Sequence, residues 1–395
     1  MKFLYTEYFN NDKINRPIET IWSEIESYTN EVFLSDTLEV KEQYSNVDIL
    51  LPILKYNGKK VKGLIVSRSA DYICSMKNIT ENNFFVIANA MWGSVSKSEK
   101  ADAYFMPYAN DEKKEWMLKT YPNFSNKLII PYQDADYTNE YELFPIDIEK
   151  DIDVFMVSRL HKCKNLDVFL KSLIYINKKY GKKLKAVILT GQKNKDEEAE
   201  SIYNEMIDIA GSKEELETYI EFIDYENPSN MFMYYSRARL TALTSIFEGK
   251  NRSLHESVLC NTPVICFSAF NRYIRGNTPI LPEGCGYYVD EFSPEAFGER
   301  LYELLNSRIE YNTREIALKH FGRALIVDKI IKSIPYYREN IPDLDKTSIL
   351  DNYFINEAVC ASGKGSYEKF LYRQKTTVPL HEKNSFSFCV QSNLL

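Results

Sequence analysis

The feature that most constrains the fold of this chain is a regular alternation of short β-rich runs with amphipathic segments, which begins at Ile152. Five runs are typical of buried strands, at residues 151–158, 185–190, 219–223, 239–244 and 263–267. After the first run, apolar residues recur at helical spacing until Gly181, namely Leu166, Phe169, Leu170, Leu173 and Ile174. This spacing predicts a helix that Gly181 ends. Strands that alternate with helices favour parallel crossovers, so we predict a doubly wound α/β sheet.

Doubly wound sheets bind ligands at the carboxyl ends of their strands. We therefore expect the site in the loops that follow Val157, Thr190, Ile223, Thr244 and Phe267. The first half of the chain contains further short apolar runs, which indicate a second α/β unit. We predict an N-terminal domain over residues 1–145, a ligand-binding domain over 146–335, and a helical to irregular tail over 336–395 that packs back on the first domain.

Charge and composition exclude several classes of partner. The 395 residues carry a net charge of −7, whereas nucleic-acid binding needs clustered Lys and Arg. The seven cysteines form no CxxC pair and the four histidines are isolated in sequence, so we expect no metal and no cofactor. The start lacks a basic leader with an apolar core, and no run is long enough to cross a bilayer. We expect a cytoplasmic protein with at most a peripheral association with the inner membrane face.

The first candidate loop follows the run at 151–158 and places Arg159 and Lys164 just before a helix. Two cations beside the positive end of a helix suit a diphosphate group, whose charge they hold and whose departure they stabilise. An ordinary solvated loop is the alternative interpretation of this segment taken alone.

The second candidate loop follows the run at 239–244 and contains Glu248 and Gly249, with Glu256 about one turn into the next helix. The two carboxylates therefore lie on either side of that helix's first amides. Gly249 allows a ligand to approach the backbone closely. Carboxylates accept paired hydroxyl hydrogen bonds, so the pattern suits a polyol at each end of a phosphate, as in a nucleotide sugar.

The order of these pieces resembles the retaining glycosyltransferases of family 4, which have the GT-B fold. The sequence SRLHKCKN at 158–165, a GQKN turn, the segment EGKNRSLHE at 248–256 and NTPVI at 261–265 follow one another as the corresponding motifs do in that family. The resemblance spans about residues 151–290 and implies two Rossmann-like domains that face each other across a cleft.

The resemblance also implies roles for individual residues. Arg159 and Lys164 would bind the diphosphate, Glu248 the sugar hydroxyls and Glu256 the ribose. We take the first three of these as catalytic. The residues expected to contact the donor are Ser158, Gly191, Gly249, Lys250, Asn251, Arg252, Ser253 and Glu256.

Several positions depart from the family pattern. Ser158 and Asn165 replace glycines, and residues 251–253 replace a Phe-Gly-Leu stretch beside the donor sugar. Residues 1–150 contain no histidine, although many relatives carry one in the first domain. Asn89 lies near where it is expected and is our candidate on the acceptor side.

These observations predict a retaining enzyme that transfers a hexose-type sugar from a UDP- or GDP-sugar to a glycan, lipid-linked or other hydroxyl acceptor, in surface polysaccharide or glycoconjugate synthesis. Two alternatives stay open. One is a GT-B sugar-nucleotide epimerase or phosphorylase. The other is a non-catalytic donor-binding subunit of a glycosyltransferase complex.

Overall fold

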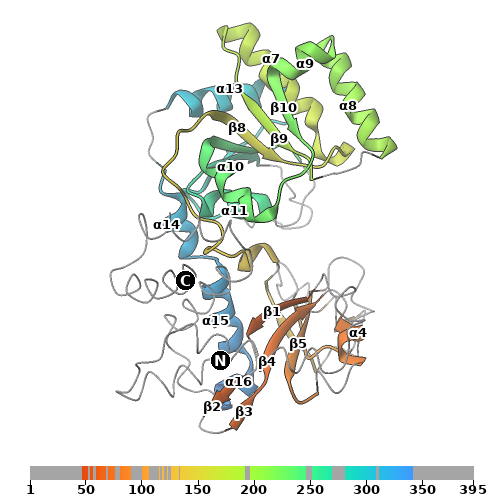
Figure 1. Ribbon diagram of the computed structural model, residues 1–395, viewed down its shortest axis with the longest axis vertical. Coiled ribbons are helices and arrows are strands. Elements are labelled where there is room, and N and C mark those ends of the chain that lie inside the picture. The colour runs from red at the N-terminus through yellow and green to blue at the C-terminus, as the bar shows by residue number, and fades with distance from the viewer. Residues whose placement is uncertain are drawn as a thin grey trace, which may run out of the picture. The chain divides into compact units, whose positions relative to one another are not determined.

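The computed structural model describes residues 47–51, 54–56, 59–67, 70–75, 81–89, 100–105, 115, 118–119, 122, 126–132, 134–191, 196–245, 251–268, 281–307 and 311–340. These residues belong to two compact units (Figure 1). Described residues up to 137, together with 323–340, form the first unit, and described residues of 138–322 form the second. No helix among these residues is long and apolar enough to span a membrane.

The second unit is built on a six-stranded sheet in which every neighbouring pair is parallel. The strand order is β10-β9-β8-β11-β12-β13, which is the Rossmann order. The strands are β8 (Ile152–Val157), β9 (Ala186–Leu189), β10 (Ile220–Ile223), β11 (Ala238–Leu243), β12 (Val264–Phe267) and β13 (Gly286–Val289). Five of them coincide with the predicted runs. The sequence did not reveal β13, an edge strand with only one fully buried residue.

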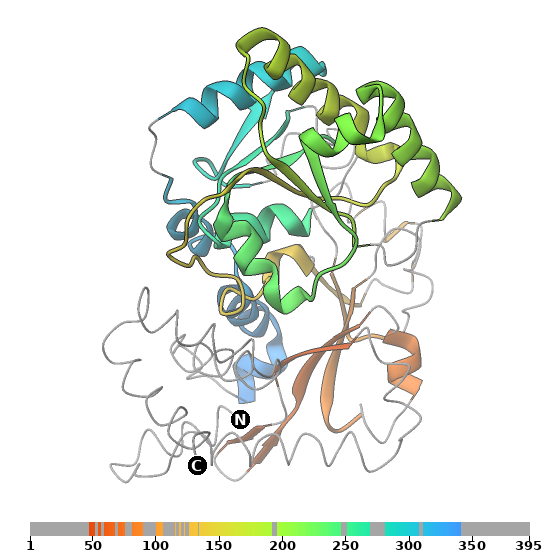
Figure 2. The ribbon, with the colours of Figure 1, turned by 45° about the horizontal axis from the view of Figure 1, so that its top comes forward.

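Helices cover both faces of this sheet (Figure 2). One face packs against α7 (Leu166–Tyr180), α8 (Glu197–Ala210), α9 (Lys213–Tyr219) and α13 (Pro294–Asn306). The other face packs against α10 (Met231–Arg237), α11 (Arg252–Leu259) and α14 (Thr313–Leu318). The unit also contains short 3-10 helices, η4 (Lys162–Lys164) and η5 (Pro228–Asn230). The doubly wound prediction is therefore confirmed, with an apolar core on each side of the sheet.

Helix α7 shows why the local sequence pattern was informative. Its five predicted apolar positions are all packed in the core, four of them fully buried and Ile174 partly. Gly181 follows the last turn at φ +64°, and its N–H donates to the carbonyl of Asn177. Glycine adopts this left-handed conformation without the steric cost that a Cβ brings, so the helix ends where the sequence predicted.

The first unit contains a five-stranded sheet of order β1-β4-β5-β6-β7. The pairs β4–β5, β5–β6 and β6–β7 are parallel, and β1 is antiparallel to β4. Its elements are β1 (Val47–Leu51), β2 (Leu54–Tyr56), β3 (Lys59–Val61), β4 (Gly63–Ser67), α4 (Ala70–Ser75), β5 (Phe84–Asn89), β6 (Ala103–Phe105), β7 (Leu128–Ile130) and η3 (Asp134–Tyr137). The predicted runs in the described part form strands, and β2 and β3 form a small hairpin that the sequence did not reveal.

Two C-terminal helices, α15 (Arg323–Ser333) and α16 (Pro335–Asn340), belong to the first unit. Tyr337 of α16 is buried, and its hydroxyl donates to the carbonyls of Lys62 (3.1 Å) and Gly63 (2.8 Å) beside β4. The chain thus returns to the first unit at about residue 323, whereas the sequence-based boundary lies at 335. A contact between residues so distant in sequence leaves no local pattern that could mark it.

Residues 138–150 lead into β8 and belong to the second unit. Leu143, Phe144 and Ile146 are buried in its core, and the ring of Phe144 stacks on Phe232 of α10 at 5.2 Å. This segment has few regular elements, yet its apolar side chains fasten it to the sheet that it precedes.

Candidate functional site

The strand order of the second unit places two loops side by side. Strands β8 and β11 are neighbours, while the chain leaves β8 toward β9 on one side and leaves β11 toward β12 on the other. Ligands of open α/β sheets bind where the strand order reverses in this way, at the carboxyl ends of the two central strands. The predicted loops after residues 157 and 244 are therefore the two that meet at this point.

The loop after β8 is held by hydrogen bonds from its own backbone and by one apolar anchor. The N–H of Ser158 donates to the carbonyl of Leu189 at 3.0 Å, and Ser158 is buried. Leu160 is also buried, in the core beneath α7. Between them Arg159 is exposed. Inward anchors on both sides of Arg159 thus present its guanidinium to the solvent at the strand end.

Direct hydrogen bonds join the two loops. The side-chain amide of Asn165 donates to the carbonyl of Thr244 at 3.1 Å. The hydroxyl of Thr244 in turn donates to the carbonyl of Lys164 at 2.9 Å. Thr244 is completely buried, whereas Asn165 and Lys164 are half-buried, so the reciprocal pair is partly protected from water. The position of Lys164 is therefore fixed through its backbone, by a residue that the sequence did not single out.

Asn165 adopts a left-handed conformation, with φ +51° and ψ +47°. Glycine and asparagine are the residues that enter this region most easily. The position is one where asparagine replaces a family glycine, and the backbone conformation explains why asparagine is accepted. Its side chain supplies in addition the bond to Thr244 that a glycine lacks.

Lys164 is half-buried, and the charge of Arg159 acts on it. Burial lowers the pKa of Lys164 most, Cys163 opposes this effect, and the charge of Arg159 lowers the pKa further. Both lowering effects disfavour the cation. An anion bound between the two side chains would relieve them, so the pair is suited to hold a charged group such as a phosphate.

The outer side of the same loop is fastened to α8. The Nδ1 atom of His161 accepts from the N–H of Cys163 at 3.2 Å, and its Nε2 atom lies 3.3 Å from the carboxylate of Glu198. The N–H of Lys162 also donates to Glu198, at 3.3 Å. Thr244 and Glu198 therefore hold the two opposite sides of the loop.

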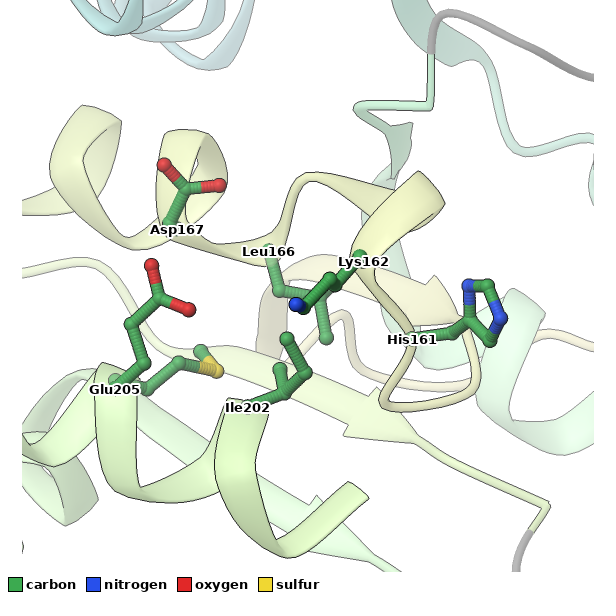
Figure 3. Close-up of a pocket in the computed structure, with 7 residues that line it drawn as sticks. His161, Lys162, Leu166, Asp167, Ile202 and Glu205 are labelled. Carbon is green, nitrogen blue, oxygen red and sulfur yellow. The ribbon is translucent and has the colours of Figure 1, made fainter. Parts of the chain in front are cut away.

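A cavity of about 360 Å³ opens beside this outer side. Figure 3 shows Asp167 and Glu205 approaching each other at one end and the ring of His161 at the other. Lys162, Leu166, Ile202 and Met206 complete the lining. The lining holds two carboxylates, Asp167 and Glu205, against one lysine, Lys162, and neither Arg159 nor Lys164 belongs to it. The cavity is therefore poorly suited to a diphosphate.

The second candidate segment forms the start of α11. The Oδ1 atom of Asn251 accepts from the N–H of Ser253 at 3.0 Å and so caps the helix. Arg252 is the first helical residue, and its Nε donates to the Oε1 atom of Glu256 at 2.9 Å. The Glu256 side chain is 14% exposed and that of Arg252 is 60% exposed. The Glu256 side chain is thus largely buried beneath an exposed arginine.

A buried tyrosine contacts the same carboxylate. The hydroxyl of Tyr235, on α10, donates to the Oε2 atom of Glu256 at 2.9 Å. Burial raises the pKa of Glu256, whereas Arg252 and Tyr235 both lower it. Sequence reasoning missed Tyr235, because it precedes Glu256 by 21 residues and lies on another helix. A tyrosine in an amphipathic segment is indistinguishable from an ordinary core residue.

His255 lies next to Glu256 in sequence and faces the core. It is buried, its ring packs on Phe321 at 4.5 Å, and its Nδ1 atom lies 3.1 Å from the carbonyl of Asn251. Among the described residues, no group of three or more His, Cys, Asp or Glu side chains could hold a metal ion.

The remaining predicted residues are spread more widely. Gly191 follows β9 in a left-handed conformation, at φ +68°. Asn89 is the last residue of β5 in the first unit and is buried. Glu248, Gly249 and Lys250 lie outside the described residues. Within the second unit the structure therefore brings together the loop at 158–165 and the strand that precedes α11, through Asn165 and Thr244.

Comparisons with known proteins agree with this architecture. Residues 142–319 match the model of the family described as "Glycosyl transferases group 1". No curated protein matches the chain at a significant level. Among solved structures, HepE from Anabaena in complex with UDP and glucose gives a TM-score of 0.51 at 12% identity, over 68% of this chain and 77% of that one. At this identity the likeness shows the fold.

Two further structures are similar at lower scores. Sucrose-phosphate synthase from Thermosynechococcus elongatus gives a TM-score of 0.47 at 15% identity, over 66% of this chain and 69% of that one. The pneumococcal O-GlcNAc transferase GtfA in complex with UDP and GlcNAc gives 0.46 at 15% identity, over 71% of this chain. The chain spans 62% of GtfA.

The family match covers the second unit almost from end to end, and the likeness to HepE covers more than half of the chain. Both agree with two Rossmann-like α/β units of largely parallel strands. The chain therefore has the GT-B fold, and the match of residues 142–319 to the glycosyl transferases group 1 family indicates a transferase.

Proposed function

We propose that this protein transfers a hexose-type sugar from a UDP- or GDP-sugar to a hydroxyl group of a glycan or lipid-linked acceptor, with retention of configuration, as family 4 enzymes do. The observation that carries the proposal is the loop after β8, where Arg159 and Lys164 lie at the point at which the strand order reverses. The bond between Asn165 and Thr244 fixes this loop before any ligand binds.

The two cations suit the most demanding step of such a reaction. The bond between the anomeric carbon and the phosphate oxygen breaks, and negative charge grows on the departing nucleoside diphosphate. Preorganised cations at that oxygen stabilise the transition state more than the ground state. In our proposal the acceptor hydroxyl attacks the anomeric carbon from the face of the sugar that the diphosphate leaves. It gives its proton to the departing phosphate, so the protein supplies no separate base.

In this proposal each of the two carboxylates binds one end of the donor. Glu256 accepts hydrogen bonds from the ribose and Glu248 from the transferred sugar. Ser158, Gly191 and the segment 249–253 border the donor. Asn89 in the first unit is our candidate on the acceptor side. We propose that turnover needs no metal ion, because Arg159 and Lys164 carry the charge of the diphosphate.

A binding panel followed by product analysis tests the proposal. UDP, GDP and their sugar conjugates are compared by thermal shift, where a ligand at 100 times its dissociation constant stabilises the protein by about 2.7 kcal/mol. The protein is then incubated with each nucleotide sugar that stabilises it and with a panel of glycan and lipid acceptors, with and without EDTA. We expect transfer to an acceptor in both conditions. Loss of all turnover in EDTA, restored by manganese, contradicts the metal-free proposal.

The same products separate the alternatives. Conversion of the donor without any acceptor indicates an epimerase, and dependence on inorganic phosphate indicates a phosphorylase. Donor binding without turnover across the whole panel indicates a binding subunit, the reading that the absence of histidine in residues 1–150 favours.

A further inference from the structure

Tyr235 lies in the core and makes contacts through both its side chain and its backbone. It is completely buried, and its ring meets Phe155 of β8 edge-on at 5.2 Å. Its backbone carbonyl accepts from the hydroxyl of Thr262 at 2.6 Å. The phenol hydroxyl ends 2.9 Å from the Oε2 atom of Glu256. Movement of the ring would break its contacts with Phe155 and Glu256, so these two contacts define the direction of the hydroxyl.

Both oxygens of the Glu256 carboxylate accept a hydrogen bond. Tyr235 donates to Oε2 and Arg252 to Oε1, each at 2.9 Å. An ionised carboxylate accepts about four hydrogen bonds, so about two acceptor positions are left. These suit two neighbouring hydroxyls, one at each oxygen. Rotation of the carboxylate about its last bond would misplace both positions.

We infer that Tyr235 is a positioning residue that orients the carboxylate of Glu256 for a vicinal diol, the two ribose hydroxyls of the nucleotide. This inference rests on the proposed function, in which Glu256 holds that ribose. Tyr235 itself touches no substrate. The Arg252 side chain is 60% exposed, whereas Tyr235 is completely buried, so the tyrosine hydroxyl is the donor that water reaches least.

The tyrosine has an electrostatic effect as well. Burial raises the pKa of Glu256, and the charge of Glu142 raises it further, while Arg252 and the Tyr235 hydroxyl lower it. A protonated carboxyl loses acceptor capacity toward a diol. Removal of the phenol hydroxyl should therefore move the loss of nucleotide binding to a higher pH, because the carboxyl then takes up its proton earlier.

The chain offers a matched control in Tyr234. Its ring also packs on Phe155, at 5.6 Å, and its hydroxyl also donates to a carboxylate, that of Glu226, at 2.9 Å. The variants Tyr235→Phe and Tyr234→Phe thus each remove one hydroxyl bonded to one glutamate and keep the ring contact. Only the first loses a contact with Glu256.

The experiment is calorimetric titration of both variants and the unaltered protein with UDP and GDP from pH 5 to pH 8, over about three units around neutrality. At pH 7 we expect Tyr235→Phe to bind the preferred nucleotide about tenfold more weakly, as for the loss of one net hydrogen bond. As the pH falls, its nucleotide affinity should begin to decrease at a higher pH than in the other two proteins; this decrease is the acid limb of the affinity profile. The terminal phosphate of the nucleotide titrates alike in all three, so the difference between them reports the protein.

Each outcome decides the inference. Equal affinities and superimposable pH profiles of the two variants overturn the role of Tyr235 and leave the proposed function intact. Absence of UDP and GDP binding in the unaltered protein overturns both. If Tyr235→Phe does not fold, 3-fluorotyrosine at position 235 replaces it, because its more acidic hydroxyl donates more strongly. The acid limb should then move to lower pH, and an unchanged limb overturns the inference.

Discussion

The loop after β8 and the start of α11 follow neighbouring regions of one sheet, yet they are built differently. In the loop, the bonds that fix the chain involve Asn165, Thr244 and backbone carbonyls. At α11, the bonds that fix the structure involve Arg252 and Glu256, the same charged groups expected to meet the ligand. In the loop, therefore, the charge of Arg159 or Lys164 can be removed without breaking the bonds that fix the chain. At α11, removal of a charged side chain also breaks a bond that fixes the structure.

The largest effect should come from the loop cations. We expect Arg159→Ala and Lys164→Ala each to lower kcat by about 10²- to 10³-fold, as for the loss of one group that stabilises charge in a transition state. Donor affinity should fall less, because the charge grows during the reaction. Steady-state kinetics with the donor found in the binding panel measure both quantities.

Lys162→Ala is the control for that experiment, since Lys162 has the same charge as Arg159 and Lys164 and lies in the same 3-10 helix as Lys164. We expect near-normal kcat for it, and unchanged thermal midpoints for all three variants. Unaltered kcat in both Arg159→Ala and Lys164→Ala would falsify their assignment to the site.

The next effect should separate the two carboxylates. Glu256→Gln should weaken free nucleoside diphosphate and intact donor alike, by roughly 10- to 150-fold, since a hydrogen bond to a charged group contributes about 1.5–3 kcal/mol. Glu248→Gln should leave the affinity for the free diphosphate almost unchanged and reduce turnover. Calorimetry and kinetics on both variants test this contrast.

Because Glu256 also bonds to Arg252 and Tyr235, its variant must be checked for stability without ligand. An equal loss of diphosphate affinity in both variants would show that the sugar and ribose ends are assigned wrongly.

A smaller effect should follow from Asn165. Asn165→Ala puts alanine, which enters the left-handed conformation less readily than asparagine, at this position and removes the bond to Thr244, so we expect a loss of about 1.5–3 kcal/mol in the free energy of unfolding. Asn165→Gly should lose less, about 0.5–1.5 kcal/mol, because glycine adopts the conformation freely. Urea denaturation of both variants measures the difference.

Asn261 provides the matched control, because it is also left-handed, at φ +57°, and lies at the end of α11. Asn261→Ala should destabilise the fold to a similar degree while UDP or GDP affinity stays normal. If the two alanine variants affect nucleotide affinity equally, the loop bond has no special role in binding.

The smallest effect should come from the opposite end of α7. Tyr175, Lys179 and Tyr180 donate to Glu299 of α13 and lower its pKa to about 2. A depressed pKa contributes stability that is present above the unfolded pKa and is lost as the pH falls toward about 2. The Glu299 side chain is 32% exposed, so solvent screens this contribution.

We therefore expect Glu299→Gln to flatten the acid limb of the stability curve slightly, between about pH 4.5 and 2, with no effect on nucleotide affinity. Thermal midpoints across that range, compared with the unaltered protein, measure it. A steeper acid limb in the variant contradicts the assigned sign.

The local elements of the second unit could be predicted from the sequence. Apolar periodicity gave α7 and its end at Gly181, and five of the six strands of this unit were predicted within about two residues of their observed ends. The positions of Arg159 and Lys164 at a strand end follow from this alone. Such features depend on neighbours in the chain, so they can be read from one segment at a time.

The segments that meet in space could be identified only from the folded structure. It placed β8 beside β11, joined Asn165 to Thr244 across 79 positions, brought Tyr235 to Glu256, and returned α15 and α16 to the first unit. The edge strand β13 is defined by its pairing with β12 rather than by its own composition. Contacts of this kind form between residues far apart in the chain, and their energy depends on packing that no single segment contains.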